Sequence, residues 1–114
     1  MTRVTLEESA KVDIAVALRS IQNFFISKES PELGRVHINL FKAELREARK
    51  ILAKNPEIFP VRPEYDRATR YGRLYRSFTI HWFIVFYTYA PSEGVIIWHV
   101  RSSRSDYSTI IMLP

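Results

Sequence analysis

The side chains most able to do chemistry follow the last apolar run of the sequence. They are His99, Arg101, Arg104 and Tyr107. Because side chains alternate along a strand, His99 and Arg101 are expected on one face, and Arg76 from another strand would join them if the register allows. Arginines can stabilise the charge of a phosphodiester while His or Tyr moves a proton. Metal-free RNA cleavage needs little more, since the 2′-hydroxyl is the internal nucleophile.

The same residues also admit a structural interpretation and a binding interpretation. In the first, Arg101 and Arg104 pair with Asp106 or the C-terminus, and Tyr107 covers the core. In the second, the arginines form a rim around an apolar sheet face that receives a segment of a partner protein. The apolar residues 110–113 would remove that site if they folded back over the face. The sequence leaves these interpretations open.

Composition narrows the possible chemistry. The formal net charge of +5 favours a polyanion or an acidic protein as partner. Every basic residue after Lys54 is an arginine, whose planar guanidinium suits phosphates and carboxylates. The chain has no cysteine, its glycines are isolated, and His37, His81 and His99 lack ligand spacing. We therefore predict no metal site, no cofactor and no phosphate-binding loop, and interpret His37 as structural.

The start of the chain and its apolar runs bear on location. The first residues contain no apolar signal-peptide core, and no uncharged apolar run is long enough to span a bilayer. We therefore expect a soluble, cytoplasmic protein.

Periodicity predicts the elements that position these residues. Val4 and Leu6 alternate with polar residues in a short strand over 2–6. Apolar residues then recur at helical spacing from about Glu7 until 27–30 breaks the pattern. Ser30 followed by a proline restarts a second helix over 31–54. Two long helices joined by so few residues must form an antiparallel hairpin.

The same spacing predicts which helix residues are buried. In the first helix the buried stripe is expected to comprise Ala10, Ile14, Ala17, Leu18, Ile21, Phe24 and Phe25. In the second it is expected to comprise Leu33, Val36, Leu40, Phe41, Ala48, Ile51 and Leu52, with Ala43 or Leu45 at its edges.

Three strands are predicted after a proline-containing loop over 55–70. They span 71–80, 82–89 and 95–100, with His81 in the first turn and a Pro- and Gly-containing loop in the second. The fold class is therefore α+β, in one domain over residues 1–114. A short N-terminal strand precedes a helical hairpin, which packs on one face of a small, mainly antiparallel sheet of three to four strands. The helical hairpin is expected to leave the other face of the sheet to a partner segment or to residues 110–113.

This order of elements resembles the RelE/ParE superfamily of bacterial toxins. The residues that carry the resemblance are Val4-Thr5-Leu6-Glu7-Glu8-Ser9-Ala10 with Asp13-Ile14, Ile51-Leu52-Ala53-Lys54-Asn55-Pro56, Arg73-Leu74-Tyr75-Arg76, His81-Trp82-Phe83-Ile84-Val85-Phe86-Tyr87, Val95–Arg101 and Arg104-Ser105-Asp106. Together these segments extend over nearly the whole chain.

The resemblance implies the toxin of a type II toxin–antitoxin system, of the kind that serves plasmid stabilisation. Such a toxin forms a hetero-oligomer with an acidic antitoxin. RelE-like members cleave mRNA in the ribosome with basic residues on the sheet and a C-terminal Tyr or His. The matching residues here are Arg76, Arg101, Arg104 and Tyr107. ParE-like members instead poison DNA gyrase and lack that catalytic set.

One departure favours one of the two branches. RelE-like toxins usually carry an arginine at the start of the central strand, where this chain has Trp82 or Phe83. We therefore predict a ParE-like toxin that targets DNA gyrase, with Arg73, His81 and His99 as binding residues. The alternatives are a metal-free, ribosome-dependent mRNA endoribonuclease and a protein-binding module that has lost toxicity.

Overall fold

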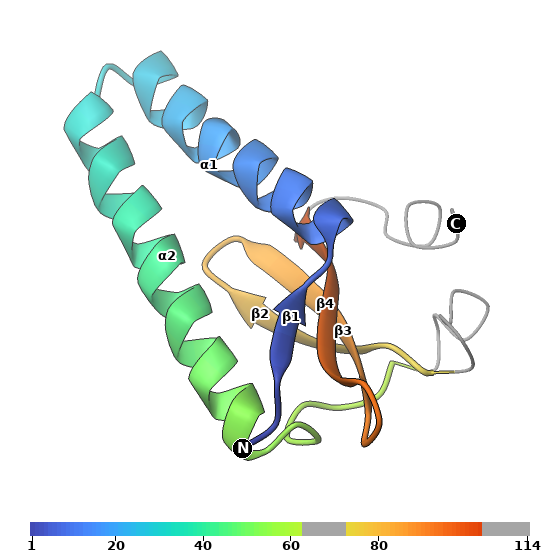
Figure 1. Cartoon of the computed structure of the whole chain (residues 1–114). Coiled ribbons are helices and arrows are strands. Elements are labelled where there is room, and N and C mark those ends of the chain that lie inside the picture. The colour runs from blue at the N-terminus through green and yellow to red at the C-terminus, as the bar shows by residue number, and fades with distance from the viewer. Residues whose placement is uncertain (63–72, 104–114) are drawn as a thin grey trace.

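The computed structural model describes residues 1–62 and 73–103. Two helices and four strands follow one another in the predicted order (Figure 1). The elements are β1 (Val4–Leu6), α1 (Glu8–Ser27), α2 (Pro31–Lys54), β2 (Arg76–Ile80), β3 (Phe83–Ala90) and β4 (Gly94–Ser102). The predicted α+β fold is confirmed.

The four strands form one sheet in the order β1-β4-β3-β2. The pairs β2–β3 and β3–β4 are antiparallel, and β1 lies parallel to β4 through Val4–Val95 to Leu6–Ile97. The sheet is therefore mixed, because the helical hairpin carries the chain from β1 back across the sheet. The predicted fourth strand is β1 at the edge.

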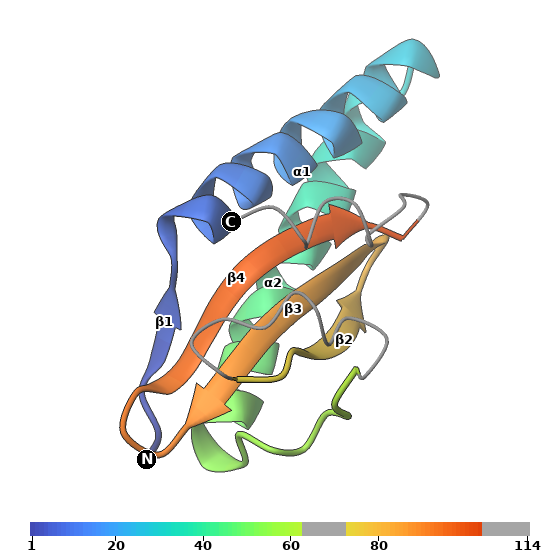
Figure 2. The same cartoon turned by 90° about the vertical axis from the view of Figure 1, so that its right-hand side faces the viewer.

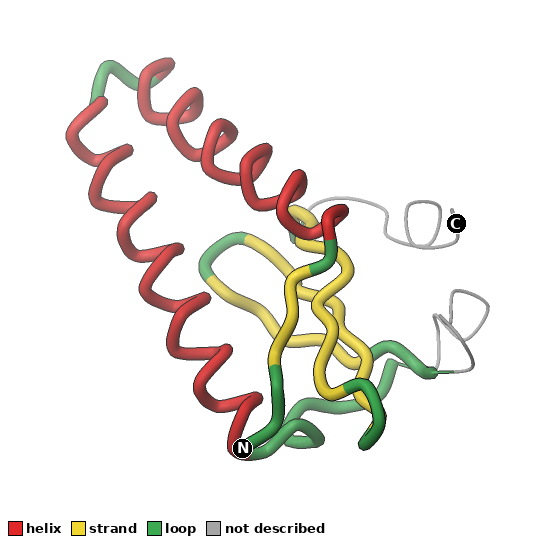
Figure 3. Tube along the Cα trace, in the orientation of Figure 1, coloured by secondary structure: helices red, strands yellow, loops and turns green. Residues whose placement is uncertain are grey.

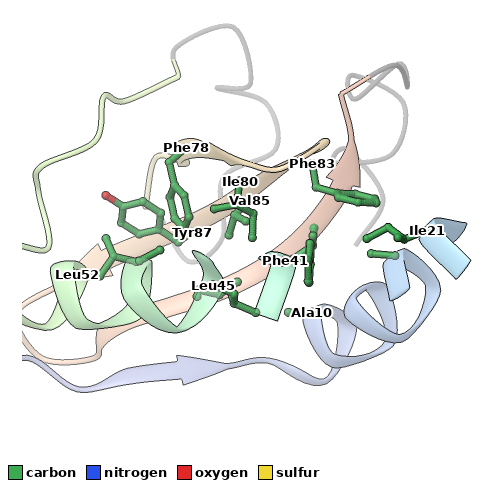
Figure 4. Close-up of a cluster of buried hydrophobic side chains, with 14 of the residues drawn as sticks. Ala10, Ile21, Phe41, Leu45, Leu52, Phe78, Ile80, Phe83, Val85 and Tyr87 are labelled. Atoms are coloured by element: carbon green, nitrogen blue, oxygen red, sulfur yellow. The ribbon is translucent and has the colours of Figure 1, made fainter. Parts of the chain in front are cut away.

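The two helices cover one face of the sheet. Figures 1 and 3 show them as a V whose closed end, at the helix–helix turn, lies away from the strands, and Figure 2 shows the sheet in front of α2, with α1 above it. The core between these layers combines alternate residues of β3 with one stripe of each helix (Figure 4). Its members include Ala10, Ile21, Phe41, Leu45, Leu52, Phe78, Ile80, Phe83, Val85 and Tyr87.

Only part of the stripe predicted to be buried in the second helix is buried. Phe41, Ala48 and Leu52 are buried as expected, together with Gly34 and Leu45. In contrast, the side chains of four residues are 41–51% exposed, namely Leu33, Val36, Leu40 and Ile51. The helix carries two apolar stripes, and only the one that meets α1 and the sheet is buried. In α1, Phe24 likewise leaves the core and is 45% exposed.

The strand boundaries also shift. The strand expected over 71–80 begins at Arg76, while residues 71 and 72 lie outside the described part. Leu74 precedes the strand and is 42% exposed. On the sheet face away from the helices, Tyr75, Phe86 and Trp98 are at most 5% exposed. Residues 110–113, one of the two covers considered for this face, lie outside the described residues.

Candidate functional site

Beyond the end of β1, side chains of α1 provide hydrogen-bond partners for the backbone at the edge of β4. Because β1 is only three residues long, β4 has no strand partner on that side after Ile97. Ser9 Oγ donates to the Trp98 carbonyl at 2.6 Å, and the Asp13 carboxylate accepts the Val100 N–H at 2.9 Å. Backbone groups that a strand would have paired are thereby satisfied, as burial requires.

Asp13 is also the centre of a charged cluster. It is 9% exposed, and its Oδ1 lies 3.3 Å from Nη1 of Arg101. Its Oδ2 lies 3.7 Å from Nδ1 of His99. The predicted neighbourhood of His99 and Arg101 is confirmed, since they lie opposite Phe86 and Ile84 on one sheet face. The sequence signal for Asp13 was an acid inside the apolar stripe of the helix.

His99 is enclosed within this cluster. It is 4% exposed, and neither ring nitrogen makes a hydrogen bond. The Tyr75 ring centre lies 6.2 Å from its own. A substrate proton therefore has no direct path to His99 in this conformation.

Arg76 does not join these residues. It shares the helix-facing side of β2 with Phe78 and Ile80, whereas His99 and Arg101 point to the opposite face. Its guanidinium donates to the Phe59 carbonyl at 2.7 Å and forms an ion pair with Glu57 at 3.4 Å. Arg76 thus links the loop after α2 to β2.

Tyr87 is the cross-strand neighbour of Arg76. Its hydroxyl donates to the Pro56 carbonyl at 2.9 Å. Burial raises the pKa of Tyr87 to about 12, although the positive charge of Arg76 opposes the shift. The phenol therefore stays protonated at neutral pH and serves as a hydrogen-bond donor.

The remaining described arginines beyond α2 are also engaged within the chain. Arg73 forms an ion pair with Glu93 at 3.0 Å, and Arg62 donates to Ser77 Oγ at 2.7 Å. Arg104 and Tyr107 lie outside the described residues. Among the sequence-predicted site residues, the structure therefore unites His99 with Arg101 and leaves Arg73 and Arg76 apart from them.

His81 belongs to a separate cluster at the β2–β3 turn. Its Nε2 lies 2.9 Å from Nδ1 of His37, and its Nδ1 lies 3.6 Å from Glu44. Burial lowers the pKa of His81, His37 lowers it further, and Glu44 opposes the shift. Sequence spacing gave no reason to pair His81 with His37, because they come from α2 and a distant turn.

A groove lies between α1, α2 and β1. Its volume is about 810 Å³, and its lining is mainly apolar. Val4, Ile14, Leu18, Phe41 and Leu45 contribute apolar surface. Basic side chains of α2 also line it, namely Lys42, Arg46, Arg49, Lys50 and Lys54. The helical periodicity of α2 gathers these cations along one side of the helix.

Within residues 1–62 and 73–103, no three His, Cys, Asp or Glu side chains come together as a set that could hold a metal ion. In the same described part, neither helix is long and apolar enough to cross a membrane.

Comparison with known proteins places this fold in a family. A family model described as the ParE toxin of the type II toxin–antitoxin system parDE matches residues 25–107, well over half of the chain. The match extends from the last turn of α1 through the whole sheet meander. A search of curated proteins found no match. The chain therefore belongs to the ParE toxin family, the toxin half of type II toxin–antitoxin systems.

Proposed function

We propose that this toxin arrests growth by acting on DNA gyrase and does not cut mRNA. The observation that carries the proposal is the separation of the arginines that a nuclease would need. Arg76 and Arg101 project from opposite faces of the sheet, and each is bound within the chain. A scissile phosphate would have to be gripped by both together.

Recruiting Arg101 to a phosphate would also be costly. Its departure would leave the Asp13 carboxylate, 9% exposed, without its cation. Removing one partner of a fully buried ion pair costs about 3–5 kcal/mol, and the cost here is lower because the Arg101 side chain is 30% exposed. This argues for a structural role of Arg101 and against a role in phosphate chemistry.

Trp82 supports the same choice. It stands immediately before β3, the central strand, and its side chain is stacked on His81 with ring centres 4.8 Å apart. A neutral ring here offers no charge to a phosphate, while a half-exposed tryptophan held in place is typical of protein contacts.

We further propose that an acidic antitoxin neutralises the toxin by filling the groove between α1, α2 and β1. The apolar lining suits the apolar face of a partner segment, and the α2 cations suit its carboxylates. The formal charge of +5 agrees with an acidic partner. Such a hetero-oligomer would act in the cytoplasm, where gyrase works.

The decisive experiment compares the two targets directly. Purified chain is added to a gyrase supercoiling assay and, separately, to ribosomes translating a defined mRNA. We expect loss of supercoiling, a DNA-damage response in cells, and intact mRNA. Ribosome-dependent mRNA cuts that disappear in Tyr107→Phe or Arg104→Ala would assign the nuclease activity instead. Unimpaired growth at high expression without antitoxin, with neither effect in vitro, would indicate a binding module that has lost toxicity.

A further inference from the structure

Two histidines from distant parts of the chain face each other where the helical hairpin meets the sheet. His37 lies on α2, and His81 lies in the turn between β2 and β3, which points toward α2 in Figure 1. Their facing nitrogens are 2.9 Å apart, and their ring centres are 5.0 Å apart. One hydrogen bond between imidazoles thus joins the two layers at this point.

Aromatic rings enclose the pair. Trp82 stacks on His81 at 4.8 Å and on His37 at 5.3 Å between ring centres. Phe25 of α1 stacks on His37 at 4.6 Å. Phe24 of α1 meets the edge of the Trp82 ring at 5.6 Å. Any movement of the two histidines therefore displaces Trp82.

The backbone of His81 is held in an unusual conformation. Its φ is +49°, in the left-handed region that residues other than Gly populate rarely, although Asn, Asp and His do so more often than the others. Such a backbone conformation persists where its surroundings hold it in place. The ring stack and the hydrogen bond to His37 hold the turn here.

The number of protons on the two rings determines whether the hydrogen bond between them can form. A hydrogen bond between two imidazole nitrogens holds a single proton, with one nitrogen as donor and the other as acceptor. One extra proton can enter at an outward nitrogen without breaking the bond. When both rings are charged, both facing nitrogens carry hydrogen and repel each other.

We propose that the His37–His81 pair is a proton switch, which holds the β2–β3 turn and Trp82 against the helical hairpin until both rings are charged and then releases them. Glu44 of α2 is the charged side chain facing His81, at 3.6 Å, and it favours the first proton. In the described contacts, α1 presents only the rings of Phe24 and Phe25 to the cluster.

The direction of the pH dependence follows from burial. The pKa of His81 lies below the ordinary histidine value of 6.5, so the folded chain binds this proton less tightly than the unfolded chain. The contribution of His81 to stability is therefore fully present above pH 6.5 and decreases as the pH falls below it. The turn is released only when both facing nitrogens carry hydrogen.

The test follows Trp82 by nuclear magnetic resonance on the ¹⁵N-labelled full chain between pH 8 and pH 5. We expect the Trp82 indole signal and the ring nitrogens of His81 to shift together as the pH falls below 6.5. His81→Asn should abolish the Trp82 shift, because asparagine tolerates the positive φ but cannot titrate. If His81→Asn does not fold, His37→Gln tests the pair independently. It removes one of the two facing imidazoles, so the turn should stay closed and only the smaller Trp82 shift caused by the stacked His81 ring should remain.

The matched control is His99→Gln. His99 is the third histidine of the chain and lies in the Asp13 cluster, away from Trp82. The His99→Gln variant should leave the pH dependence of the Trp82 signal unchanged. A Trp82 signal that does not move with pH, or moves equally in wild type and His37→Gln, overturns the proposal.

Discussion

At the scale of single residues, Asp13 joins α1 to β4. Its two carboxylate oxygens satisfy the Val100 N–H of β4 and the guanidinium of Arg101. A carboxylate that is 9% exposed is tolerated only because it is hydrogen-bonded and paired. Asp13 thus replaces the missing end of an edge strand and pairs with Arg101.

We expect Asp13→Ala to lower the free energy of unfolding by about 2–4 kcal/mol, because it leaves a buried N–H and a cation unpaired. Denaturant unfolding monitored by circular dichroism measures the effect. The control is Glu8→Ala, which removes an exposed ion pair with Lys11 at 3.8 Å and should have little effect. Equal losses in both variants would contradict the role given to Asp13.

At the scale of elements, α2 shows how burial is decided. It carries two apolar stripes, and contact with α1 and the sheet buries the one that contains Phe41, Leu45 and Leu52. The other stripe, with Leu33 and Leu40, stays exposed. Helical spacing therefore predicted the helix correctly but mixed the two stripes in the predicted core.

Adjacent residues near the end of α2 test this assignment. Leu52 is fully buried and Ile51 is 41% exposed. We expect Leu52→Ala to cost about 2–5 kcal/mol because it leaves a cavity, and Ile51→Ala to cost less than about 1 kcal/mol. Thermal or urea unfolding of the two variants gives the comparison. A larger loss for Ile51→Ala would show that the opposite stripe faces the core.

At the scale of the whole molecule, the groove between α1, α2 and β1 combines an apolar lining with basic side chains. The hairpin opens as a V toward the strands (Figure 3), and apolar residues of both helices and β1 line the space between them. The basic residues of α2 lie along the same groove. This arrangement supports the proposed acidic antitoxin better than a flat sheet face would.

We expect Arg46→Glu with Lys50→Glu to weaken antitoxin binding at least tenfold, since both side chains line the groove. Titration calorimetry of the toxin with its antitoxin gives the affinity. The control is Arg19→Glu on the exposed side of α1, which lies outside the groove and should preserve binding. Loss of affinity that is equal in the control would place the antitoxin elsewhere.

Much of this protein follows from its sequence. The period of the apolar residues determined two helices and a strand meander, because a helix and a strand each need one apolar side to bury. The resemblance of Val4–Ala10 and His81–Tyr87 to RelE/ParE toxins indicated the family that the family model confirmed. The neighbourhood of His99 and Arg101 followed from alternation along one strand.

The tertiary structure alone decided which polar residues meet. Register and sheet order placed Arg76 on the helix-facing side, and the short β1 left an edge of β4 for Asp13 to complete. Packing of α2 against the β2–β3 turn brought His37 to His81 across a separation of 44 residues. Local periodicity carries no information about such contacts, because they depend on how whole elements dock and not on spacing within any one of them.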